Sequence, residues 1–286
     1  MTVEILPPVA PIARLRARMA EKPWRGLLEG AARAGYVARG AVYVSTGVIG
    51  LLAALRLTPH AQGPVGALEA WSHWPPGVAL LWVIGLGLYA FAGWRALQSV
   101  FDIDRSGGGL KATFARAGQA ISGITYGALG VSVFGLIDAL NDLRQPDEQA
   151  ATRHGVEAVL GLPFGDLLVM AAGAFVIAAG AGSIIRAMVT DLCEALACDE
   201  DLRPWLRALA QVGYVGRGVA LLPAGALLVL AGWDARAAEA RGVGGALETL
   251  MAVGEPVLAL TAVGVIAFGL FAILEGALRR IRWPAG

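Results

Sequence analysis

Charged residues are scarce in this sequence, and long stretches of it have none. Only 16% of the 286 residues are Asp, Glu, Lys or Arg, whereas soluble globular chains usually carry about 25%. No Asp, Glu, Lys, Arg or His occurs in six stretches, which are 40–55, 74–94, 117–137, 167–185, 218–233 and 256–274. About 20 apolar residues form a helix that crosses the hydrocarbon core of a bilayer. The sequence therefore predicts an all-α membrane protein with six transmembrane helices.

Other missing patterns exclude further classes of protein. A soluble helical bundle is disfavoured because six uncharged stretches would leave it too little polar surface. The alternating segments of about ten residues that build a membrane β-barrel are not visible. Residues 1–33 are rich in arginine and proline but have no apolar segment followed by a cleavage site. We therefore expect a basic cytoplasmic or interfacial segment there rather than a secretory signal.

Motifs for catalysis and metal binding are also missing. Cys193 and Cys198 have four residues between them and no histidine nearby, which is a poor spacing for a metal site. The three histidines, His60, His73 and His154, fall in outer loops, and no span carries an ionisable residue at its middle as a proton relay would. No Walker loop, GxSxG or HExxH pattern occurs. We expect no catalytic residue, no metal, no cofactor and no nucleic-acid partner.

The basic residues that are present predict the orientation in the membrane. If the N-terminus lies inside, the inner segments hold 18 of the 23 lysines and arginines and the outer loops hold five. Inner loops of membrane proteins carry this excess. The sequence therefore predicts that both termini face the cytoplasm.

A two-helix unit occurs three times along the chain. The copies occupy residues 34–101, 116–190 and 210–280, with an acidic cytoplasmic loop over 191–207 before the third. Because each copy has two spans, all three enter and leave the membrane on the same side, and we expect parallel repeats in a pseudo-threefold bundle. Glycines recur at matched positions, and they predict close helix packing, with the lining of a narrow pore as the alternative. They are Gly35, Gly40, Gly47 and Gly85 in the first copy, Gly118, Gly123, Gly130 and Gly173 in the second, and Gly213, Gly218, Gly225 and Gly264 in the third.

These motifs resemble those of the DUF1206 family of bacterial membrane proteins, which consist of three two-helix repeats. The resemblance rests on the GYxxRG openings at Gly35 to Gly40 and Gly213 to Gly218, on the ALEA-like segments, and on the glycine-rich second helices. It covers about residues 30–280 and implies the fold and a location in the bacterial inner membrane, but no activity. The middle copy departs from the pattern, since Gln119 and Ser122 replace the tyrosine and the arginine.

Arg39, Arg217 and Glu275 are the intramembrane charges that stand out. Each arginine precedes one of the two shortest uncharged stretches, so each lies four positions into a span that begins at Gly35 or Gly213. A buried arginine there would take a carboxylate or phosphate partner, and Glu275 lies at a compatible depth. The alternative is that both guanidiniums extend to lipid headgroups at the interface.

Three glutamates occupy matched positions before the second helix of each copy, in segments that read as short interfacial helices. They are Glu69, Glu157 and Glu248. Threefold symmetry would place them in a ring at an outer mouth, which would favour cations. The alternative is that each lies on the wet face of a surface helix.

These observations leave two main functions open. The first is a structural or accessory membrane protein that binds the lipid bilayer, an anionic lipid or a membrane-protein partner. The second is a small channel or facilitator along the pseudo-threefold axis. The lack of charge at mid-span favours the first, and an intramembrane enzyme is disfavoured because no nucleophile–base pair is visible.

Overall fold

The structure, a computed structural model, describes residues 22–72, 74–101, 109–142, 148–193, 196 and 200–279. Most of the basic segment over 1–33, together with His73 and Cys198, lies outside these residues. The helices in chain order are α2 (Lys22–Ala54), α3 (Pro64–Ser72), α4 (Pro75–Phe101), α5 (Leu110–Asp142), α6 (Glu148–Leu160), α7 (Gly165–Val189), α8 (Arg203–Trp233), the 3-10 helix η1 (Ala237–Glu239), α9 (Gly242–Val253) and α10 (Glu255–Leu278).

Six of these helices, α2, α4, α5, α7, α8 and α10, are long and apolar enough to cross a membrane. They contain the six uncharged stretches apart from Leu55 and Trp74, and their number agrees with the predicted six spans. The short helices α3, α6 and α9 each precede the second long helix of a copy, where the sequence predicted short helices.

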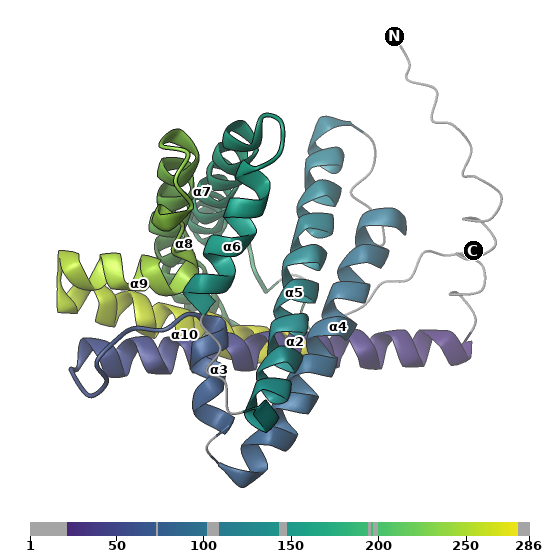
Figure 1. The fold of residues 1–286 in the computed structure, drawn as a ribbon. Coiled ribbons are helices and arrows are strands. Elements are labelled where there is room, and N and C mark those ends of the chain that lie inside the picture. Colours follow the sequence, from purple (N-terminus) through teal and green to yellow (C-terminus); the bar gives the residue numbers. More distant parts are fainter. Residues whose placement is uncertain are drawn as a thin grey trace.

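The long helices associate in three pairs, and each pair joins two different copies. The pairs are α2 with α10, α4 with α5, and α7 with α8. Weaker contacts of α2 with α4 and of α8 with α10 join the pairs into one molecule. Figure 1 shows the α2/α10 pair running across the α4/α5 pair rather than alongside it.

The middle copy departs from the other two in how its own helices pack. In the first and third copies the two long helices contact each other, whereas in the described residues α5 and α7 have no comparable contact. The six helices therefore form a row in the order α5, α4, α2, α10, α8 and α7. Because the helices at the two ends of this row, α5 and α7, have no comparable contact with each other in the described part of the chain, the row does not close into a ring. The expected pseudo-threefold bundle is therefore not confirmed.

Glycines lie where the helices of each pair come closest. A Cβ added at Gly40 would lie 2.6 Å from the carbonyl oxygen of Gly269 on α10, and one at Gly218 would lie 2.7 Å from that of Gly180 on α7. The corresponding position on α5, Gly123, faces the carbonyl oxygen of Ala92 at 3.2 Å. Small residues permit such backbone approach, which in lipid takes the place of the hydrophobic effect between helices.

The other predicted packing glycines fall into three groups. Gly35 and Gly213 lie against the backbone of Phe91 and Phe268, the second helix of their own copy. Contacts between helices are also made by Gly47, Gly130, Gly225, Gly85, Gly173 and Gly264. Gly118 is an exception, since a Cβ there would meet no atom within 4 Å. This part of α5 lies on the open side of the middle copy, which explains why no helix packs on it.

Candidate functional site

The two unusual arginines lie near the middle of their helices. The sequence placed Arg39 and Arg217 four residues into spans that begin at Gly35 and Gly213. In the structure α2 already begins at Lys22 and α8 at Arg203. The helix macrodipole acts within the first and last turns only, so it does not oppose either guanidinium.

Aromatic rings from four helices surround the guanidinium of Arg39, which is only 6% exposed. Its Cζ lies 4.8 Å from the ring centroid of Phe268 on α10 and 5.3 Å from that of Phe91 on α4. The rings of Tyr126 on α5 and Tyr43 on α2 follow at 5.7 and 5.8 Å. Cations are attracted to ring faces within about 6 Å, most strongly where water is excluded.

Arg217 enters the same cluster from α8. Its Cζ lies 5.2 Å from the centroid of Phe268, the ring that Arg39 also faces. Its Nη1 donates to Ser183 Oγ on α7 at 2.6 Å, and its Nε donates to Tyr43 Oη at 3.3 Å. Tyr126 Oη donates to the same Tyr43 hydroxyl at 3.0 Å.

All six long helices thus contribute to one cluster, which we name the arginine–aromatic centre. It consists of Arg39, Tyr43, Phe91, Tyr126, Ser183, Arg217 and Phe268.

The arginine–aromatic centre carries positive charge without a matching carboxylate. Among the described residues neither Arg39 nor Arg217 forms a salt bridge, and Arg39 Nε is buried without an acceptor. Because both guanidiniums face the ring of Phe268, they are at most about 10 Å apart, and two such charges repel by roughly 2 kcal/mol or more at an effective dielectric of about 20. The rings and the neutral hydroxyls only partly offset this repulsion and the loss of hydration.

Among the described residues, Glu275 forms no ion pair with Arg39 or Arg217, so the pairing predicted from the sequence is not observed. Glu275 instead forms an ion pair with Arg279, four residues further along the chain at the end of α10. Arg279 in turn lies over the ring of Tyr36 at 5.3 Å. The i, i+4 geometry brings these two side chains together locally, and the carboxylate therefore stays at the end of the helix.

Further arginines bind the ends of the paired helices next to the centre. Arg33 on α2 donates to the carbonyl oxygens of Gly276, Ala277 and Arg279 at the C-terminal end of α10. The last four carbonyls of a helix lack partners within it, and cations near this end also complement the helix dipole. Arg33 thus holds the end of α10 on α2.

An arginine makes the equivalent contact in the α4/α5 pair. Arg116 on α5 donates to the carbonyl oxygens of Ser99 at 2.6 Å and Val100 at 3.2 Å, at the C-terminal end of α4. Arg33 and Arg116 each lie two residues before one of the matched glycines, Gly35 and Gly118. The same kind of contact therefore occurs at the same position of the first and second copies.

The comparisons with known proteins agree with the repeat. A family model described as Domain of Unknown Function (DUF1206) matches residues 34–102, 117–190 and 212–279. The chain belongs to the DUF1206 family. The three matched segments confirm the three tandem copies. An uncharacterized protein YxxB of Bacillus subtilis (strain 168) is 27% identical over 271 residues, which cover 92% of this chain and 94% of the relative. No solved structure matches the chain.

Sequence reasoning missed the tyrosines and phenylalanines of this DUF1206 protein. Tyr43 and Tyr126 are 83 residues apart, each four residues after the position of the motif arginine in its copy. That shared spacing was a signal for both. Phe91 and Phe268 carry no such signal, because only the fold shows that they lie opposite Gly35 and Gly213.

The structure does not bring the three outer glutamates together. Glu69 on α3 and Glu248 on α9 are half-buried, whereas Glu157 on α6 is exposed and lies 3.7 Å from Nδ1 of His154. No contact among the three glutamates occurs in the described residues. The carboxylate ring therefore stays a prediction.

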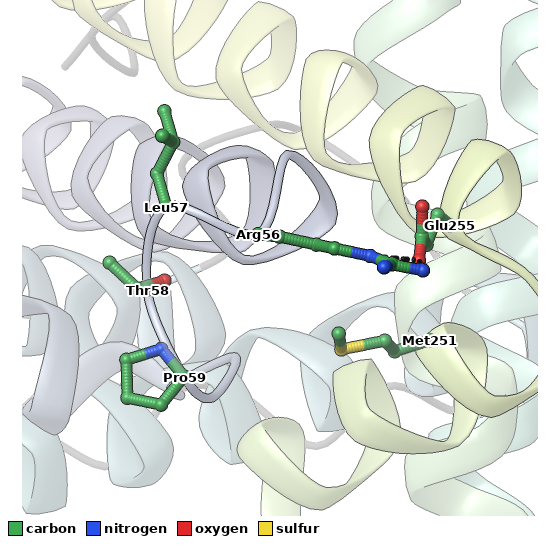
Figure 2. Close-up of a pocket in the computed structure, with 6 residues that line it drawn as sticks. All are labelled: Arg56, Leu57, Thr58, Pro59, Met251 and Glu255. Carbon is green, nitrogen blue, oxygen red and sulfur yellow. Dashed lines mark hydrogen bonds and ion pairs between the residues drawn. The ribbon is translucent and has the colours of Figure 1, made fainter.

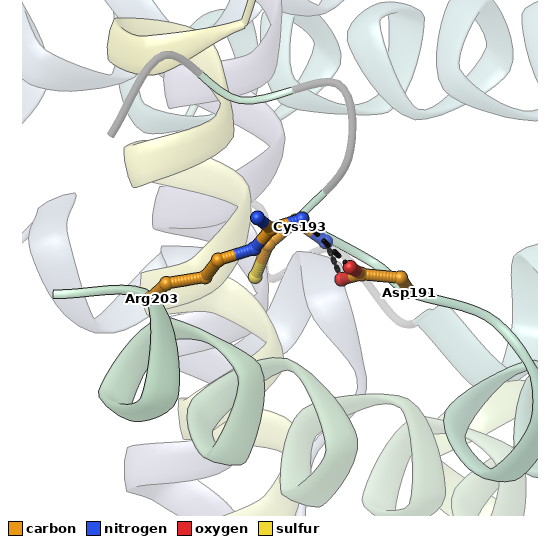
Figure 3. A network of polar contacts seen from close by, with 3 residues as sticks. All are labelled: Asp191, Cys193 and Arg203. Atoms are coloured by element: carbon orange, nitrogen blue, oxygen red, sulfur yellow. Dashed lines mark hydrogen bonds and ion pairs between the residues drawn. The ribbon is translucent and has the colours of Figure 1, made fainter. Parts of the chain in front are cut away.

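Just after the C-terminal end of α7, Asp191, Cys193 and Arg203 form a small polar network. Arg203 donates to Asp191 at 2.8 Å, and the backbone N–H of Cys193 donates to the same carboxylate at 3.1 Å (Figure 3). The Cys193 N–H, followed by Arg203, lowers the pKa of the Asp191 carboxyl below its ordinary value. Within the described ranges no group of His, Cys, Asp and Glu side chains has the arrangement of a metal site.

At the opposite end of the long helices, an ion pair lies beside a shallow pocket. Arg56 Nη2 and Glu255 Oε1 are 2.5 Å apart, next to Leu57, Thr58, Pro59 and Met251 (Figure 2). Both side chains of the pair are substantially exposed, so the interaction is worth little by itself. It links the end of α2 to the start of α10.

Proposed function

We propose that this DUF1206 protein is a non-enzymatic accessory protein of the bacterial cell membrane that binds anionic lipid at its inner side. In this proposal both termini lie in the cytoplasm, and the three helix pairs stand around an approximate threefold axis. The observation that carries the proposal is that arginines gather at one end of all three pairs. Arg33 and Arg116 bind the ends of α10 and α4, and Arg203 binds Asp191 just after α7.

Two further arginines extend this basic end outward. Arg186 near the end of α7 and Arg207 in the first turns of α8 are both exposed. With the N-terminus inside, these side chains face the cytoplasmic leaflet. Each basic residue near an anionic leaflet contributes about 1 kcal/mol of attraction. An anionic lipid headgroup is therefore favoured over a neutral headgroup at this surface.

Lipid retention tests the proposal directly. The purified protein is placed in nanodiscs of mixed phosphatidylglycerol and phosphatidylcholine, and the lipids that it retains are identified by native mass spectrometry. Replacing Arg186 and Arg207 with glutamine should weaken the preference for phosphatidylglycerol by about 2 kcal/mol, or roughly 30-fold.

The matched control replaces Arg236 and Arg241, which are exposed on the opposite side, with glutamine. The control should retain phosphatidylglycerol as the wild type does. A wild type that retains both lipids equally would refute the proposal, and a retained membrane protein instead of a lipid would replace it with the partner-binding role.

A second candidate, the small facilitator, has one observation in its favour. The hydroxyls of Tyr126, Tyr43 and Ser183 and the guanidinium of Arg217 form a continuous polar connection from α5 to α7. The ring of Phe268 fills the space beside it, so passage would require that ring to move. Anion flux from liposomes that contain the protein would support this candidate, and flux equal to that of empty liposomes would remove it.

A further inference from the structure

The arginine–aromatic centre has donors that its own residues do not use. A guanidinium has five N–H donors and no acceptor. Arg39 is only 6% exposed to solvent, and its buried Nε has no hydrogen-bond acceptor among the described residues. Tyr43 Oη accepts hydrogen bonds from Tyr126 and Arg217, so its own proton is left to donate.

The second guanidinium in the centre has only weak acceptors. Within the described residues the hydrogen bonds of Arg217 go to Ser183 and Tyr43, which are both neutral hydroxyls. A charged acceptor forms hydrogen bonds about twice as strong as a neutral one. An anion in this place would replace Ser183 as the partner of Arg217.

We infer that the arginine–aromatic centre binds the phosphate group of an anionic ligand between Arg39 and Arg217, with the Tyr43 hydroxyl as a further donor. This inference rests on the proposed function, and it names the site and the chemistry of the bound group. Arginine suits phosphate because its planar fork matches two phosphate oxygens at once. One phosphate would satisfy Arg39 Nε and neutralise the repulsion between the two guanidiniums.

The centre lies deeper than the headgroup region, so a free ion and a lipid headgroup would reach it differently. Arg39 lies six residues along α2 from Arg33, which caps the end of α10. Six residues correspond to about 9 Å along a helix. The polar headgroup region of a bilayer is about 5 to 8 Å thick on each side, so a headgroup phosphate at the level of Arg33 would have to be drawn in by nearly two helical turns to reach Arg39.

Two probes distinguish the source of the phosphate. The first is phosphatidylglycerol in nanodiscs, with retention measured by native mass spectrometry. The second is inorganic phosphate added to the protein in nanodiscs of phosphatidylcholine alone, with the thermal midpoint followed by tryptophan fluorescence. A rise of the midpoint with inorganic phosphate identifies a free oxyanion, and retention of phosphatidylglycerol without such a rise identifies the headgroup. Either result supports the site if the variants below abolish it.

The deciding variants are Arg39→Gln and Arg217→Gln, each of which should weaken binding of the effective probe at least tenfold. Arg241→Gln, which removes an exposed charge on the opposite side, should leave binding unchanged. If a glutamine variant fails to fold, Arg39→Lys and Arg217→Lys replace it, because lysine keeps the charge but lacks the fork. These lysine variants should weaken binding at least threefold.

Two results would overturn the inference, and they differ in what they leave standing. If the wild type prefers phosphatidylglycerol and the centre variants prefer it equally, the site is wrong but the proposed function stands. If the wild type responds to neither probe, both are wrong.

Discussion

Gly225 offers the sharpest test of how the helices are held together. A Cβ added at this position of α8 would lie 2.8 Å from the carbonyl oxygen of Gly173 and 2.8 Å from the backbone nitrogen of Ile177, both on α7. Ordinary contacts begin near 3.4 Å, so the two helices would have to separate by several tenths of an ångström. Gaps of about 0.5–1 Å forfeit a quarter to a half of the dispersion energy of the atoms concerned.

Alanine at Gly225 should therefore destabilise the protein despite its better helix propensity. Overpacking of a close contact costs about 1–3 kcal/mol, and the gain in propensity offsets at most about 1 kcal/mol of this. Gly182→Ala is the matched control on α7, because a Cβ there would meet no atom within 4 Å. The control should be neutral or more stable than the wild type by up to about 1 kcal/mol.

Unfolding of both variants in mixed micelles of increasing SDS fraction, followed by tryptophan fluorescence, measures the difference. The expected order of stability is Gly182→Ala, wild type, Gly225→Ala. If Gly225→Ala were as stable as Gly182→Ala, close approach of α7 and α8 would not be what the glycine provides, and the packing argument would fail.

Two further predictions concern the helix ends. Arg116→Ala should destabilise the protein by about 1.5–3 kcal/mol, because it leaves the carbonyls of Ser99 and Val100 without their charged donor; a loss below about 0.5 kcal/mol in SDS unfolding would contradict this link. Asp191 should stabilise its loop above the ordinary carboxyl pKa, since its folded pKa is lowered, and this contribution should fade as the pH falls through the folded pKa. Amide exchange of the loop at pH 6 and pH 3 should show the fading in the wild type but not in Asp191→Asn.

The spans and the repeat could be read from the sequence because both are local properties. A membrane-crossing helix needs only the absence of charge over about 20 residues, and the matched positions of Gly40, Gly123 and Gly218 define the copies without reference to contacts. The packing partners of these glycines could not be predicted from the sequence, because the helix that faces each glycine belongs to a different copy. Gly40 packs on α10, some 230 residues away in the chain.

The charge partners were also beyond the sequence. Glu275 and Arg39 lie at compatible depths, and depth alone suggested a pair. In the structure Glu275 forms an ion pair with Arg279, which lies one helical turn further along the chain. Aromatic rings instead surround Arg39. Which of several neighbours a buried charge takes depends on side-chain geometry across helices, and periodicity does not encode it.

The differences among the three copies bear on function more than their likeness does. At the position of the motif arginine the copies carry Arg39, Ser122 and Arg217, and four residues later they carry Tyr43, Tyr126 and Leu221. The first copy thus supplies both a cation and a hydroxyl, the second only a hydroxyl, and the third only a cation.

A third arginine would add a further repulsion of similar size to that between the first two, in a centre that already lacks a carboxylate. The copy that lacks the arginine is also the one whose long helices, α5 and α7, make no comparable contact with each other in the described residues and have the least buried spans, at 28% and 22%. Both guanidiniums of the centre therefore come from the first and third copies, and the second copy contributes only a neutral hydroxyl from each of its two long helices. A symmetric pore would present the same groups from every copy, whereas two guanidiniums that face one ring suit a single bound anion, which favours binding over passage.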